Sequence, residues 1–190
     1  MRATAVGMLL LVTACGGPDV TPEATPEAAL PERPAVPVGW RTITTDEGDV
    51  ELAVPPDLVV IHTAGSIHGF REEDEGIASL AVVAIPASEL VQPRGDESVE
   101  EWADAGGWLT AGQGQLAGDV RRRDVLLPSG PAIQLTSAYQ VGDLGDAWTM
   151  LHVVRTPRGY GLLQVSGQGP PPEEPSEEIR SIRDLVRFAG

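Results

Sequence analysis

The chain has 190 residues, with 28 acidic against 13 basic side chains and a formal net charge of −15. This acidic excess argues against nucleic-acid binding, which requires basic groups that neutralise phosphates, and against a charge-driven attachment to anionic lipids. Hydrophobic residues make up 42% of the chain, which is typical of a folded domain and not of a disordered one.

A secretory leader is predicted over residues 1–14. It has a basic residue at position 2, the apolar run "VGMLLLV" and a small pair before the cysteine, which is the layout of a signal peptide. The run is far shorter than the roughly 20 residues that a membrane-spanning helix needs. The sequence Val12-Thr13-Ala14-Cys15 resembles the bacterial lipobox, and the resemblance implies cleavage before Cys15 and attachment of a diacylglycerol to its thiol.

A lipid anchor on Cys15 would determine where the protein resides. Two or three acyl chains hold a protein on a membrane durably, whereas one chain gives only marginal binding. We therefore expect a lipid-anchored, extracytoplasmic protein of the bacterial cell envelope, with the membrane as one of its partners. Because Cys15 is the one cysteine, its lipidation leaves the domain without a disulfide, a thiolate metal site or a cysteine nucleophile.

Residues 15–37 are predicted to form a disordered tether that begins at the lipidated cysteine. Proline recurs every few residues among acids and small side chains, as in "GGPDVTPEATPEAALPERPAVP". Such a composition cannot bury enough apolar surface to offset the entropy of ordering the chain. Residues 38–190 are then a single domain, with a length that suits one hydrophobic core.

The first half of this domain predicts strands followed by a helix. Strands at 39–45 and 50–55 flank the acidic turn "DEGD" and form a hairpin. "DLVVIHT" continues as a short strand, and the apolar run at 77–86 predicts a central strand covered on both faces. The spacing of the apolar residues then changes to a helical one in "SVEEWADAGGWL", where a Ser-x-x-Glu capping box begins a helix over 98–109.

The second half predicts an antiparallel meander and a closing helix. Four strand candidates, "DVRRRDVLLP", "AIQLTSAYQV", "AWTMLHVVRT" and "YGLLQVSG", are separated by short turn signals. In the second of them apolar and polar side chains alternate, as in a strand with one face toward the core. An amphipathic helix follows over 176–189, capped by Ser176, with a core stripe of Ile179, Ile182, Leu185 and Val186.

The order of these elements resembles that of PsbP/Mog1-like domains. "LPSGPAIQL" at 127–135 is similar to the opening of a strand in that family, and "IRSIRDLVRF" is similar to its terminal helix. Bacterial lipoproteins of the LpqN/LpqT type share this layout and this kind of leader. The resemblance implies an α+β fold, an α-β-α sandwich whose antiparallel sheet has helices on both faces. It also implies an accessory or partner-binding role, and it carries over no catalytic residue and no cofactor.

The segment "HTAGSIHGFREEDE" holds the main candidate binding residues. His62 and His68 flank a loop of small residues and Glu72 and Glu73 follow, so imidazole and carboxylate groups could border a ligand pocket or hold Zn²⁺. The six-residue offset between the histidines is not a usual ligand spacing, so we expect no metal. Trp108, which follows a double glycine, is a candidate exposed anchor for a protein partner.

Two further features have a structural and a functional interpretation. The basic cluster Arg121, Arg122 and Arg123 predicts charges on a strand edge, with a site for an anionic partner as the alternative. His152, within a strand, predicts a hydrogen-bonded structural histidine. The serines lack the G-x-S-x-G pattern of a nucleophile elbow, and we do not expect an enzyme.

Two hypotheses about function follow. The first is a non-enzymatic envelope lipoprotein that binds an envelope protein as an accessory module, which predicts an exposed apolar patch with a polar rim. The alternative is a small-ligand or metal-binding lipoprotein with a pocket near the His62–His68 acidic loop. It predicts a concave site with converging polar groups.

Overall fold

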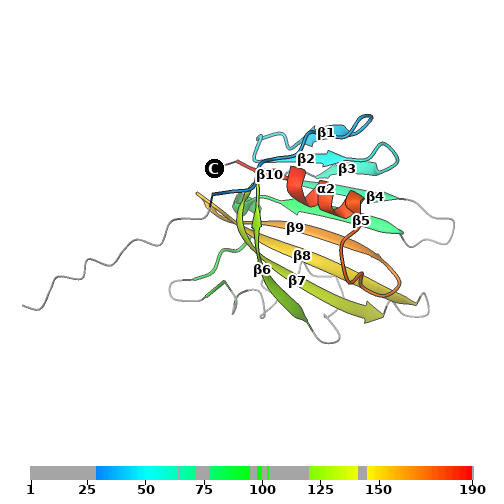
Figure 1. Cartoon of the computed structure of the whole chain (residues 1–190). Coiled ribbons are helices and arrows are strands. Elements are labelled where there is room, and N and C mark those ends of the chain that lie inside the picture. Colours follow the sequence, from blue (N-terminus) through cyan, green and yellow to red (C-terminus); the bar gives the residue numbers. More distant parts are fainter. Residues whose placement is uncertain are drawn as a thin grey trace, which may run out of the picture.

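Two antiparallel sheets make up most of the structure, which is a computed structural model (Figure 1). The structure describes residues 29–63, 65–71, 78–94, 98, 99, 102, 120–140 and 145–189. The predicted leader and Cys15 lie outside these ranges. No helix in the described ranges is long and apolar enough to span a membrane.

The larger sheet has seven strands in the order β3-β4-β5-β9-β8-β7-β6, and every neighbouring pair is antiparallel. Its strands are β3 (Val59–Thr63), β4 (Ser66–Arg71), β5 (Leu80–Ile85), β6 (Arg121–Leu127), β7 (Gly130–Gln140), β8 (Asp146–Thr156) and β9 (Gly159–Gln168). The smaller sheet has the order β1-β2-β10, with β1 (Arg41–Thr44), β2 (Val50–Val54) and β10 (Arg187–Phe188). A short 3₁₀ helix η1 (Ala87–Glu89) follows β5.

The predicted hairpin and meander are confirmed. β1 and β2 pair across the acidic turn, where Gly48 has a φ of 74°, a value that favours glycine. Strands β6 to β9 follow one another as the predicted meander, and β5 lies inside the sheet between β4 and β9. Its inward side chains are buried, whereas those on the other face are half-buried, so the coverage of β5 is less complete than predicted.

The closing helix is shorter than predicted. α2 (Glu177–Leu185) begins at Ser176, whose hydroxyl accepts a hydrogen bond from the Ile179 N–H at 3.3 Å, as the capping pattern predicts. The helix ends at Leu185 and the chain becomes extended, so that Phe188 pairs with Val50 of β2. The prediction of helix to residue 189 is wrong because this tertiary pairing outweighs the local helical pattern.

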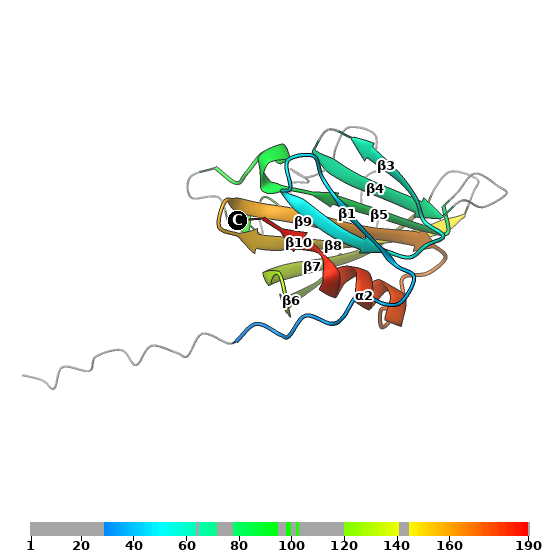
Figure 2. The ribbon, with the colours of Figure 1, turned by 90° about the horizontal axis from the view of Figure 1, so that it is seen from above.

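The expected α-β-α sandwich is also wrong. The described residues are mostly strand, and the face of the large sheet that carries the main core is covered by the small sheet together with α2 (Figures 1 and 2). This core brings together side chains of β2, α2, β4, β5, β8 and β9. A second sheet therefore occupies part of the area where the family resemblance implied helices.

The opposite face of the large sheet has its own apolar cluster. Trp102 is 3% exposed and packs there with Leu135 and Leu151. The backbone N–H of Trp102 donates to the carbonyl of Ser98 at 3.0 Å, which is one helical turn at the start of the predicted 98–109 helix. The remainder of that segment lies outside the described residues.

Residues 29–37 run along the domain without regular secondary structure. Arg33 donates to the carbonyl of Leu185 at the end of α2, and its guanidinium lies 3.6 Å from the carboxylate of Glu51. Arg33 therefore attaches the C-terminal part of the predicted tether to the domain.

Candidate functional site

The predicted histidine loop is for the most part a β-hairpin. β3 and β4 pair so that Ile61 lies opposite His68 and His62 lies opposite Ile67. Directly paired residues share a face and successive residues alternate, so positions 62 and 68 belong to opposite faces of the hairpin. The register therefore does not bring the two histidines together, while Glu72, Glu73 and Trp108 lie outside the described residues.

His68 is half-buried on the face of the sheet that points away from the small sheet. Its Nε2 lies 2.9 Å from the hydroxyl of Ser66, and burial lowers the pKa of its imidazole. Burial therefore favours the neutral form of the ring. Within the described ranges, no three His, Cys, Asp or Glu side chains form a group that could hold a metal ion.

The edge strand β3 exposes large apolar side chains. Val59 is 44% exposed and Ile61 is 51% exposed, and both point to the same face as His68 and Phe70, their partners on β4. β3 is the end strand of the large sheet, so one row of its backbone groups faces no other described strand. An apolar strand with an unpaired backbone edge can pair with a strand of another protein.

The other end strand of the large sheet, β6, exposes charged side chains. β6 begins with Arg121, Arg122, Arg123 and Asp124, and all four are exposed. Charged side chains on an edge strand hinder edge-to-edge association, and arginine repels a second copy of the same edge. The predicted strand-edge position of the basic cluster is therefore confirmed. The two end strands of the large sheet differ in their exposed side chains, because β6 begins with charged residues and β3 exposes apolar ones.

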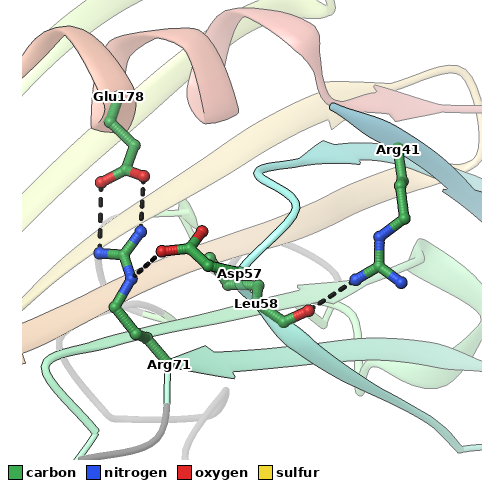
Figure 3. A network of polar contacts seen from close by, with 5 residues as sticks. All are labelled: Arg41, Asp57, Leu58, Arg71 and Glu178. Carbon is green, nitrogen blue, oxygen red and sulfur yellow. Dashed lines mark hydrogen bonds and ion pairs between the residues drawn. The ribbon is translucent and has the colours of Figure 1, made fainter. Parts of the chain in front are cut away.

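A polar network fixes the base of the β3–β4 hairpin (Figure 3). Arg71 at the end of β4 donates to Glu178 of α2 at 2.7 and 3.5 Å, and to Asp57 at 2.6 Å. The hydrogen bond from Arg71 lowers the pKa of Asp57, and both carboxylates raise the pKa of Arg71. Arg41 of β1 also donates to the carbonyl of Leu58 at 2.6 Å. The residues next to β3 are thus joined to β1, β4 and α2.

This network makes the edge a preorganised surface. Leu58, directly before β3, is 1% exposed and belongs to the main core. A partner strand would meet a backbone that is already held in its extended geometry, which reduces the ordering entropy lost on binding.

The sequence predicts a strand at "DLVVIHT", but this strand is not among the predicted binding residues. No signal in the sequence distinguishes this strand as an exposed edge, because the apolar run Val59-Val60-Ile61 is equally typical of a buried strand. Its position at the end of the sheet depends on pairing with distant strands and has no local signature.

Comparisons with known proteins give little further information. No family model matches the chain, and no curated protein matches it. Among solved structures, the chain is similar to a protein from Bacteroides thetaiotaomicron VPI-5482, with a TM-score of 0.47 and 8% sequence identity. That similarity covers 80% of this chain and 49% of the other, so the chain spans about half the length of that protein.

Proposed function

We propose that this protein is a lipid-anchored, non-enzymatic module of the bacterial cell envelope that binds an envelope protein at the edge of β3. The observation that carries the proposal is the contrast between the two edges of the large sheet. The first four residues of β6 are charged and exposed, whereas β3 exposes Val59 and Ile61. Sheet edges are normally protected against pairing, so an apolar edge that no described strand covers favours a binding role.

The partner would contribute an extended segment. Main-chain hydrogen bonds to β3 would supply affinity, and alternate apolar side chains of the segment would pack on Val59 and Ile61. Because the chain has a net charge of −15, a partner with basic residues beside the apolar ones would associate faster. The anchor on Cys15 would confine both proteins to one membrane surface and so raise their effective concentration.

Site-specific photo-crosslinking in the native bacterium tests the docking edge. The full-length chain would carry a photoreactive residue at position 61, and a matched chain would carry it at position 38, where Val38 is fully exposed outside the sheets. We expect one crosslinked protein from position 61 and none from position 38. The product should disappear when Val59 is changed to Lys. No product from position 61, or the same products from both positions, would refute the docking site.

Metabolic labelling tests the anchor separately. The unmodified chain should incorporate a labelled fatty acid and the Cys15→Ser variant should not, and globomycin, which inhibits lipoprotein signal peptidase, should cause the uncleaved precursor of the unmodified chain to accumulate. An unmodified chain without label, or a Cys15→Ser variant that carries as much label as the unmodified chain, would contradict the lipid anchor on Cys15. This outcome would leave the β3 test unaffected.

A further inference from the structure

A small cavity lies at the β6 end of the large sheet, on the face that α2 also covers. Its volume is about 140 Å³, and its polar lining comes from β6, β7, α2 and the segment before α2: Arg121, Arg123, Gln134, Thr136, Glu173 and Arg183. Three of the 13 arginines of an acidic chain thus border one cavity that holds a single carboxylate.

The strand geometry of β6 selects two of its three arginines for this cavity. Arg121 lies opposite Thr136 and Arg123 lies opposite Gln134, so both arginines share the cavity face of the sheet. Arg122 belongs to the other face, where its guanidinium lies 3.3 Å from the carboxylate of Asp124. The carboxylate of Asp124 therefore offsets the positive charge of Arg122, and it does not offset the charges of Arg121 and Arg123 on the cavity face.

The floor of the cavity is a buried polar network. Gln134 is 7% exposed and Thr136 is 5% exposed. The Gln134 carbonyl oxygen lies 3.3 Å from Nε2 of the fully buried His152, and the Gln134 amide donates to the Thr136 hydroxyl at 3.3 Å. Because the Thr136 oxygen accepts this bond, its own proton is available to donate to a ligand.

Arg183 supplies a cation from the opposite wall. Its side chain is 19% exposed, and its Nε donates to Asp184 at 2.7 Å. The guanidinium has five N–H donors in a planar fork, so one carboxylate partner does not use them all. Three guanidinium groups around one cavity repel one another, and a bound anion would remove this repulsion.

We propose that this cavity binds a small free oxyanion, of the phosphate or carboxylate class. Guanidinium forks match the geometry of two oxygens on one centre, and charge-assisted hydrogen bonds of this kind are the strong ones. The volume is below the roughly 300 Å³ at which pockets for larger organic ligands begin, and well above the roughly 30 Å³ share of one water. The net negative charge of the chain opposes contact with an anionic lipid surface, which favours a small diffusible anion. The site is distinct from the β3 edge and does not depend on the proposed partner.

Isothermal titration calorimetry on the full-length chain in non-ionic detergent tests the site. Inorganic phosphate and succinate would be titrated separately at constant ionic strength, with sodium chloride as the control titrant. We expect saturable binding of at least one of the two anions and none of chloride. Absence of saturable heat for both anions would refute the proposal.

The adjacent arginines supply a matched pair of variants. Arg123→Gln should weaken anion binding by on the order of tenfold or more, because it removes a charge-assisted hydrogen bond. Arg122→Gln removes the same charge from the other face of β6 and should leave affinity unchanged within about twofold. Equal weakening in both variants would indicate a general charge effect and would overturn the assignment. If Arg123→Gln does not fold, Arg121→Gln makes the same test from the neighbouring position on the same face.

Discussion

His152 gives a sharp prediction about the dependence of stability on pH. Its side chain is fully buried in β8, and its pKa is lowered from an ordinary value of 6.5 to about 3, by burial and then by the positive charge of Arg183. The unfolded chain therefore binds a proton on this ring between pH 6.5 and pH 3 that the folded chain does not bind. The free energy of unfolding is highest above pH 6.5 and falls as the pH decreases through this range.

The magnitude follows from the two pKa values. Between pH 7 and pH 5, protonation of the unfolded state at an ordinary histidine pKa lowers the free energy of unfolding by about 2 kcal/mol. The His152→Gln variant has no titrating ring at this position and should lack this contribution. Carboxylates also titrate toward pH 5, so the informative quantity is the difference in unfolding free energy between the natural chain and the variant.

Urea denaturation followed by tryptophan fluorescence measures that difference at pH 7, 6 and 5. The difference in unfolding free energy between the natural chain and the variant should decrease by about 2 kcal/mol from pH 7 to pH 5, even if the variant is less stable at every pH. His68→Gln serves as the control and should keep most of the natural pH dependence, because His68 is only half-buried. An unchanged difference, or an NMR titration in which the His152 ring protonates near pH 6.5, would refute the reasoning.

Three further predictions concern packing and backbone geometry, and each is measured by urea denaturation at pH 7. Arg71→Met, which removes the clamp between β4 and α2, should lower the free energy of unfolding by about 1–2 kcal/mol, and the loss should be smaller in high salt. Ser176→Ala removes the helix cap and should cost about 1 kcal/mol, whereas Ser176→Asp should retain most of the stability. Gly130→Ala should cost about 1–3 kcal/mol, since φ is 137° and a Cβ would lie 2.8 Å from the carbonyl oxygen of Arg155. Gly145→Ala should cost less, because its φ of 101° is also unfavourable but no atom lies within 4 Å of the added carbon.

The sequence pattern predicted strands well where each strand pairs with its neighbour along the chain. The β1–β2 hairpin and the meander from β6 to β9 join neighbours in sequence, so alternation and turn residues were sufficient to predict them. The same patterns could not predict the fold class. Whether a sheet face is covered by a helix or by another sheet depends here on the packing of β2 against side chains of β4, β5, β8 and β9, which no local pattern encodes.

The polar positions of β7 show a second limit. Gln134 and Thr136 alternate with apolar residues and were predicted to occupy the polar face of a half-buried strand. Both are in fact buried, and residues of the segment before α2 line one cavity together with them. A polar residue in an alternating strand therefore indicates which face it is on, and it does not indicate whether that face is solvated.

The pairing of β10 with β2 also imposes an order on biosynthesis. Val50, Leu52 and Val54 contribute to the same core as Ile182 and Val186, so this core stays incomplete until these C-terminal residues have left the ribosome. Contacts between such distant segments form late in folding, because closing a long loop loses entropy before the contacts are gained. A nascent chain of this design cannot complete its core early. If the chain is exported, as the predicted leader implies, this delay would keep the polypeptide unfolded while it passes through a translocation channel.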